Sequence, residues 1–315
     1  MPDVRPAAVA GMFYPAAPSA LAADVRMHLA GAQSGLSAEN VVPKALIAPH
    51  AGYIYSGPIA ASVYARLAAG RETIRRVVLF GPTHRVPVRG LALPSTRAFA
   101  TPLGTVAVDR EAAAAALTLP QVCASDAAHA LEHSLEVQLP FLQAVLGEFS
   151  IVPFAVGDAT PGEVAEVIEL LWGGPETLIV VSSDLSHYHR YADARELDRA
   201  TGEAILALSA TLDHEQACGA TPINGLLLAA RRHDLQAELL DLRNSGDTAG
   251  DRSRLKALAP GEADEAAGHE LRRGQRHQSA GRLEQRHVDH RALAGDAAPE
   301  EGGGDTHDAP QAGAH

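Results

Sequence analysis

The sequence has few of the residues that several classes of protein require. Its 315 residues include two cysteines, Cys123 and Cys218, which are too few for a disulfide-rich secreted scaffold and favour a reducing cytoplasm. Acidic residues outnumber basic ones by 38 to 26, and the net charge of −12 argues against nucleic acid or an anionic membrane as the main partner. No apolar run reaches the roughly 18 residues of a membrane span, and the first residues do not resemble a signal peptide.

The common catalytic signatures are also missing. The chain contains no G-x-G-x-x-G, no G-x-x-x-x-G-K-[ST] and no G-x-S-x-G, so a Rossmann dinucleotide site, a P-loop and a nucleophile elbow are unsupported. No C-x-x-C pair occurs, and the stretch that begins His214-Glu215 ends in Cys218 where a zincin helix needs a second histidine.

Residues 255–315 differ in composition from the rest of the chain. They include no aromatic residue, no isoleucine and a single valine, Val288. Such a segment buries too little apolar surface to offset its conformational entropy, so we expect a disordered tail. Residues 1–254 contain no Pro/Gly/Ser-rich linker and are predicted to form one domain.

Within that domain, apolar runs alternate with segments of helical periodicity. This alternation predicts an α/β domain, a single-domain sandwich around a mixed, largely parallel sheet. Buried strands are predicted at 44–49, 74–81, 149–156 and 177–182, with a further strand near 237–242. Helices are predicted at 57–68, 110–117, 134–146 with a kink at Pro140, 161–172, 193–209, 213–218 and 223–232.

Three histidines follow predicted strands after a few small, proline or polar residues. His50 follows the run KALIAP, His84 follows IRRVVLFG, and His187 follows TLIVVS. In open α/β sheets, ligands gather beyond the carboxyl ends of the strands, so neighbouring parallel strands would bring these imidazoles to one crevice. Neutral imidazoles suit Fe, Zn, Cu or Ni. Three loop histidines in hydrogen-bonded structural roles are the alternative.

A fourth polar cluster, Glu132-His133-Ser134, stands just before a predicted helix. His133 or Ser134 in the role of a helix cap is one interpretation of this cluster. The other is that Glu132 supplies a carboxylate near the histidine crevice.

Seven motifs, in this order, resemble the Memo family, whose bacterial and archaeal members are also called AmmeMemoRadiSam system protein B. The resemblance covers about residues 5–254. The motifs are PAAVAGMFYP (6–15), APHAGYIYSG (48–57), GPTH (81–84), EHSLEVQLPFL (132–142), SSDLSHY (182–188), CGATPINGL (218–226) and NSGDTAGDRS (244–253).

The resemblance implies a fold similar to that of class III extradiol ring-cleaving dioxygenases, with a metal site in a crevice. It implies metal ligands at His50 and His84, and it places His187 at the position of the acid/base histidine of those dioxygenases. Animal members complete a His-His-Cys site with a cysteine near the C-terminus, but the stretch NSGDTAGDRS has none, which leaves Asp247 as the nearest carboxylate. A His-His-carboxylate set resembles the facial triad of non-haem Fe(II) enzymes. Cys218 belongs to another motif and is interpreted as a buried small hydrophobe.

The resemblance also bears on the C-terminal tail. Family members usually continue after the Asp-Arg-Ser stretch with an apolar closing strand, whereas this chain changes composition near Leu255. A frameshift or mis-assigned gene end is one explanation, and a natural extension is the other.

Three functional hypotheses follow. The first is a mononuclear oxidoreductase or lyase that uses Fe(II), with Cu or Zn as alternatives, and in which His187 moves protons and Asp184 orients it. The second is a protein that binds a metal, or a phosphorylated or anionic ligand, without turnover, and this ligand is a small molecule or a peptide. The third is an accessory partner of a radical SAM protein. The candidates for contacting a substrate are Tyr53, Tyr55, Glu132 and His133, with core packing as the alternative for the two tyrosines.

Overall fold

The computed structural model describes residues 3–33 and 42–248. The strands in this part of the chain are β1 (Val4–Arg5), β2 (Ala45–Ala48), β3 (Arg76–Pro82), β4 (Leu91–Leu93), β5 (Ala98–Thr101), β6 (Gly104–Val108), β7 (Val122–Ala124), β8 (Ser150–Val156) and β9 (Thr177–Ser182). The α-helices are α1 (Pro18–Gln33), α2 (Tyr53–Tyr64), α3 (Arg110–Ala116), α4 (Asp126–Ala130), α5 (Leu139–Val145), α6 (Pro161–Leu170), α7 (Tyr191–Leu206), α8 (Ala220–Arg232) and α9 (Ser245–Thr248). Two 3₁₀-helices are η1 (Ala65–Gly70) and η2 (Glu136–Gln138).

The described strands form one sheet in the order β1-β5-β6-β8-β3-β9-β2, and β4 joins it by pairing with both β8 and β7. Only the β5–β6 and β4–β8 pairings are antiparallel among them. The predicted α/β class with a mixed, largely parallel sheet is therefore confirmed. The four apolar runs predicted as buried strands are β2, β3, β8 and β9, and the last three are buried along nearly their whole length, as expected for strands covered on both faces.

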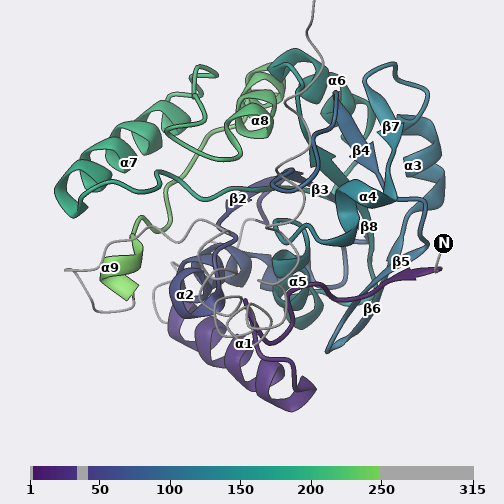
Figure 1. Ribbon diagram of the computed structural model, residues 1–315. Helices are drawn as coiled ribbons and strands as arrows, with labels where there is room; N and C mark the ends of the chain where they lie inside the picture. Colours follow the sequence, from purple (N-terminus) through teal and green to yellow (C-terminus); the bar gives the residue numbers. More distant parts are fainter. Residues whose placement is uncertain (1–2, 34–41, 249–315) are drawn as a thin grey trace, which may run out of the picture. The chain divides into compact units, whose positions relative to one another are not determined.

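Helices cover both faces of this sheet, as Figure 1 shows. Helices α1, α2 and α5 pack against one another on one side, and α6 packs against α8 on the other. Each helix layer buries its apolar side chains against the sheet, which places the hydrophobic core on either side of β3, β8 and β9. This layered arrangement leaves the carboxyl ends of the parallel strands free to carry loops with functional side chains.

Several predicted elements differ from the structure. The predicted strand near 237–242 is wrong: this segment pairs with no strand of the described residues, and its leucines line a cavity instead. The helix at 213–218 is also wrong, because the Asp213 carboxylate accepts the backbone N–H groups of Glu215 and Gln216 and so forms a turn. The predicted helix 134–146 is split, since Pro140 stands in the first turn of α5 rather than at a kink. Helix α1 was not predicted.

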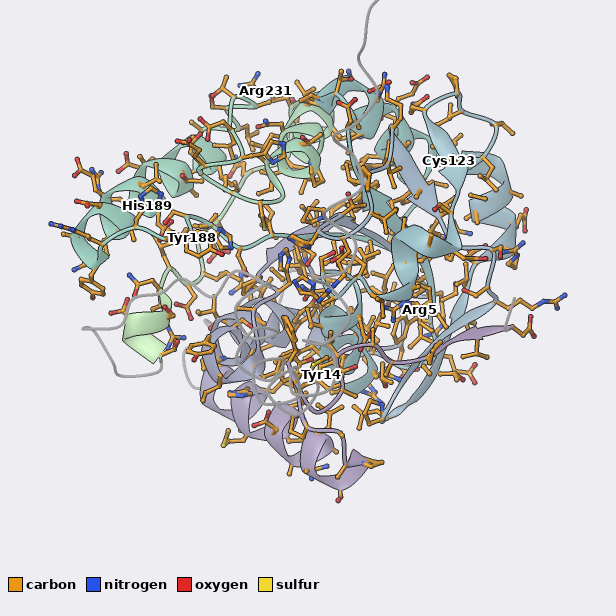
Figure 2. All side chains as sticks on the ribbon, viewed as in Figure 1. Arg5, Tyr14, Cys123, Tyr188, His189 and Arg231 are labelled. Atoms are coloured by element: carbon orange, nitrogen blue, oxygen red, sulfur yellow. The ribbon has the colours of Figure 1, made fainter. Side chains whose placement is uncertain are left out.

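The N-terminal segment is fixed by a buried ion pair. The Arg5 guanidinium lies 2.5 Å from the Glu136 carboxylate, and it also donates to the backbone carbonyl groups of His129 and Glu132. The Tyr14 hydroxyl donates to the same Glu136 carboxylate at 2.5 Å, and Figure 2 labels Arg5 and Tyr14. Because both charges are paired and hydrogen-bonded, this network is tolerated in the core and ties the start of the chain to the segment that precedes α5.

His129 beside this network makes stability sensitive to acid. Burial lowers the pKa of His129 to about 4, whereas an unfolded histidine titrates near ~6.5. The unfolded state binds more protons in that interval, so the free energy of unfolding should fall as the pH drops from about 6.5 to about 4. This linkage is worth on the order of 2 kcal/mol at a pH of about 4.5. His129→Gln, which keeps a donor toward the Ala92 carbonyl, should therefore lose less stability on acidification than the wild type in urea denaturation.

The matched control is the exposed His214→Gln, which removes an imidazole without changing the core. Equal acid sensitivity of the wild type and His129→Gln would contradict the prediction.

All described residues belong to one compact unit. The predicted domain boundary at residue 254 and the predicted tail at 255–315 lie outside the described residues. No helix within residues 3–33 and 42–248 is long and apolar enough to cross a membrane.

Candidate metal centre

Three neighbouring parallel strands end at one edge of the sheet and carry the predicted site. Strand β9 pairs in parallel with β2 on one side and with β3 on the other. His50 follows β2 by two residues, His84 follows β3 by two residues, and the loop with Asp184 and His187 follows β9. The sequence pattern of strand, short polar segment and histidine therefore brings these loops to one edge of the sheet. Of the three histidines predicted to converge there, His50 and His84 belong to one cluster, and its third member is His133 and not His187.

The tautomer of His50 is fixed by its neighbours. Its Nδ1 lies 2.9 Å from the Ser182 hydroxyl, which donates its single hydrogen to the Ser134 carbonyl and accepts a hydrogen bond from the Gln138 side-chain amide. The hydroxyl has no second hydrogen to give, so His50 Nδ1–H must be the donor and Nε2 carries the lone pair. Burial lowers the pKa of His50 to about 4, so the ring is neutral near pH 7 and Nε2 is available as a ligand.

His84 is oriented by a buried carboxylate. Its Nδ1 lies 2.9 Å from Glu132 Oε1, and its backbone N–H donates to Glu132 Oε2 at 2.6 Å. The backbone N–H groups of His133 and Ser134 also donate to Glu132 Oε1. Burial alone would raise the pKa of Glu132, but the hydrogen bonds and charges of His84 and His133 hold it well below its usual range. The ionised carboxylate keeps the proton of His84 on Nδ1, which leaves Nε2 as the lone-pair nitrogen.

His133 completes a cluster of three imidazoles. Its ring stacks on that of His84 with centroids 4.6 Å apart, and the edge of the cluster is formed by His50, whose ring centroid lies 5.3 Å from that of His133. The side chain is 1% exposed, and burial lowers its pKa to about 3. Nδ1 of His133 lies 3.3 Å from Glu132 Oε1 without the geometry of a hydrogen bond, whereas Nε2 of His133 and Nε2 of His84 have no hydrogen-bond partner within the described residues.

These nitrogens fit a metal ion. One ring nitrogen from each of His50, His84 and His133 lies within 4.8 Å of the others. Buried polar atoms without partners are costly, and neutral imidazoles with oriented lone pairs are the ligands that Fe, Zn, Cu and Ni accept. The three-histidine group therefore suits one transition-metal ion, whose identity the donor set alone does not fix.

The remaining predicted site residues have different places. Asp247 lies in α9, where its carboxylate accepts a hydrogen bond from the Tyr191 hydroxyl, and it does not belong to the three-histidine group. Asp184 Oδ1 accepts the backbone N–H of His50 at 2.7 Å, and its Oδ2 lies 4.0 Å from His50 Nε2. Tyr53 is buried, and its hydroxyl donates to the Val137 carbonyl.

A cavity of about 620 Å³ lies beside this centre, bounded by β2, α2, α7, α8 and residues 235–245. Its walls carry many apolar residues, and the polar residues Ser183, Asp184, His187 and Tyr55 also line it. Asp184 is the link between the two features, because it lines the cavity and also holds the His50 backbone. Small-molecule sites typically combine an apolar cavity with a few polar groups of this kind.

Sequence reasoning missed two features of the centre. The sequence predicts a helix cap or a substrate contact at His133. Its place in the cluster follows from the chain order, because His133 directly follows Glu132 and the Glu132 carboxylate binds His84. The sequence also does not predict that Cys218, interpreted as a buried small hydrophobe, places its Sγ 3.3 Å from His50 Nε2. Burial raises the pKa of the Cys218 thiol to about 12.

Comparisons with known proteins show the family to which the chain belongs. The chain matches the family model described as Memo-like protein over residues 5–259. It is 37% identical to a MEMO1 family protein of Methanosarcina barkeri, over 81% of this chain and 98% of the relative. MEMO1 family proteins of Archaeoglobus fulgidus and Aquifex aeolicus are also 37% identical, over 80% and 81% of this chain and 96% and 97% of the relatives.

The structure thus defines an α/β protein that carries a histidine cluster at the carboxyl ends of its parallel strands. The chain belongs to the Memo family.

Glu132→Gln should weaken metal binding by roughly 10–100-fold, the usual effect of losing the group that orients a histidine ligand. The substitution removes the negative charge that fixes the His84 tautomer. One carboxylate oxygen that accepts backbone N–H groups would become an N–H₂ group, which cannot accept them. Metal affinity is measured by competition with a chromophoric chelator, and thermal melting reports any loss of stability. The exposed Glu203→Gln serves as the control and should leave both quantities unchanged. Unchanged affinity in Glu132→Gln would contradict the orienting role.

Proposed function

We propose that this chain holds one divalent transition metal on His50, His84 and His133 and uses it for oxidoreductase chemistry of the kind performed by extradiol dioxygenases. The observation that carries the proposal is a set of buried imidazole nitrogens, at His84 and His133, without hydrogen-bond partners in the described part of the chain. A site of neutral imidazoles, two of which have fixed tautomers, is preorganised for binding a cation. Fe(II) is the proposed ion, with Cu and Zn as alternatives.

The chain's own residues would perform distinct tasks. Ser182 and Glu132 fix the tautomers of His50 and His84, so that each presents a lone pair. Three protein ligands leave coordination positions open, and the bound ion would there act as a Lewis acid or exchange electrons with a substrate.

The adjoining cavity supplies the place for a substrate. His187 and Asp184 both line it, so a group bound there meets an imidazole that can accept or donate a proton and a carboxylate that keeps His50 in place. The apolar walls would exclude water from such a ligand. We propose His187 as the acid/base group and Asp184 as a positioning residue.

Metal analysis of the full chain purified without oxygen tests this function. We expect about one transition-metal ion per chain, and uptake of oxygen when catechol derivatives are added to the iron-loaded protein. A folded protein that takes up no iron, copper or zinc would overturn the proposal. One ion per chain without any oxygen uptake would retain the metal site and overturn the oxidoreductase chemistry in favour of binding without turnover.

A further inference from the structure

The two arginines that line the cavity beside the metal centre are already paired with carboxylates. Arg66, on the extension of α2, lies 2.9 Å from the Glu238 carboxylate. Arg243 donates two hydrogen bonds to Asp241, one to each carboxylate oxygen. Glu238 and Asp241 line the same cavity, so the charge of each arginine is offset within the cavity wall itself.

Lys44, the lysine that lines the cavity in the described part of the chain, is also fully engaged. An ammonium group has three N–H donors. Those of Lys44 meet the backbone carbonyl oxygens of Trp172, Gly174 and Thr177 at 2.5 to 2.8 Å. A phosphorylated or carboxylated ligand would therefore find no unpaired lysine or arginine of the described residues in this cavity.

Two carboxylates that line the cavity have no lysine or arginine partner within the described residues. Asp198, on α7, is 7% exposed, and its Oδ1 accepts the backbone N–H of Ser186 at 3.0 Å. Asp184 Oδ1 accepts the backbone N–H groups of His50 and Ala51. Burial raises the pKa of Asp198, as expected for a carboxylate whose charge no neighbouring cation offsets. A ligand that brought a positive charge would stabilise these two groups.

Both carboxylates border the loop between β9 and α7. Asp184 belongs to this loop, and Asp198 holds it through the Ser186 N–H. The other walls of the cavity are largely apolar and come from α2, α8 and residues 235–242. The cavity thus combines acidic groups at one loop with an apolar surface large enough for the body of a small molecule.

We propose that the ligand of this cavity is an apolar molecule that carries a protonated amine, and that its ammonium group binds beside Asp198 and Asp184. This inference rests on the proposed function, because it names the class of substrate for the site proposed there. An ammonium group donates hydrogen bonds to carboxylates and offsets their charge, and such pairs are stronger in a partly buried place than in water. A cavity of about 620 Å³ lies within the usual range for small-molecule sites.

Three probes that share one apolar body test the inference: 4-phenylbutylamine, 4-phenylbutanol and 4-phenylbutyrate. Their binding to the full chain as purified is measured by calorimetry at a pH of about 8, where an ordinary aspartate is ionised and an ordinary histidine is neutral. This pH matters because His187 and His189 also line the cavity. We expect the amine to bind at least about tenfold more tightly than the alcohol, and the acid at least about tenfold more weakly than the alcohol.

Asp198→Asn tests the carboxylate directly, because it removes the charge and keeps an oxygen that can accept the Ser186 N–H. The affinity for the amine should fall at least about fivefold, whereas the affinity for the alcohol should stay the same. Glu196→Gln is the matched control, because Glu196 is exposed on the same helix and does not line the cavity. The ranking of the three probes on the wild type does not depend on the folding of any variant.

Equal affinity for the amine and the alcohol, or tighter binding of the acid, would overturn the inference, and so would the absence of binding by all three probes. Unchanged affinity for the amine in a folded Asp198→Asn would overturn the role of Asp198. Metal analysis of the same preparation keeps the two proposals apart. A chain that holds a metal but does not prefer the amine overturns this inference alone, whereas a folded chain that takes up no metal overturns the proposed function even if the amine binds most tightly.

Discussion

His50→Ala and His84→Ala should each lower metal affinity by more than about 100-fold, beyond the roughly 10–100-fold effect of losing an orienting group. Each histidine contributes a nitrogen whose proton has been placed on the opposite side of the ring by Ser182 or Glu132. A centre with three imidazole ligands and open positions has no spare protein donor to replace one that is removed. Affinity is measured by chelator competition with zinc, and metal content by elemental analysis of the purified variants.

His133→Ala distinguishes the ligand sets that the sequence and the structure favour. A centre of His50, His84 and His133 predicts a loss in His133→Ala similar to that of the other two variants, with Asp247→Asn close to the wild type. A His-His-carboxylate centre that uses Asp247 predicts the opposite pattern. The control is His233→Ala, because His233 stacks on Trp172 and is not one of the three clustered histidines. Equal metal content in the wild type, His50→Ala and His84→Ala would contradict the site itself.

The sequence allowed prediction of His50 and His84 because both follow strands that can be recognised locally. Runs such as KALIAP and IRRVVLFG are largely apolar, so they predict buried parallel strands. Residues just beyond the carboxyl ends of such strands are the ones expected to contact a ligand. The third histidine of the cluster depends on a tertiary contact. His133 reaches His84 because Glu132 binds His84 and because Ser134 donates to the Pro82 carbonyl at the end of β3. No periodicity in the sequence encodes those contacts.

The errors in the fold prediction have a similar origin. Residues 237–242 are apolar enough to resemble a strand, but apolar side chains can equally line a cavity, and the pattern alone does not distinguish these outcomes. The contact of Cys218 with His50 also depends on tertiary packing, because Gly219 packs on Ser183 and so brings the turn before α8 against the loop after β9.

His187→Ala should leave the metal and the fold in place and lower oxidoreductase turnover by roughly 10²–10⁴-fold, the usual contribution of a general acid/base. His187 lies in the loop after β9 and lines the cavity, but it is not one of the three clustered histidines. Turnover, metal content and melting temperature are therefore measured on the same variant.

Loss of metal together with activity would show that His187 is a ligand instead. A fall in stability of about 1–3 kcal/mol, with unchanged activity per folded molecule, would show a structural hydrogen-bonding role. His189→Ala is the matched control, because His189, labelled in Figure 2, lies two residues further along the same loop. His189 also lines the same cavity. If both variants lose turnover equally, the effect belongs to the shape of the loop and not to a proton carried by His187.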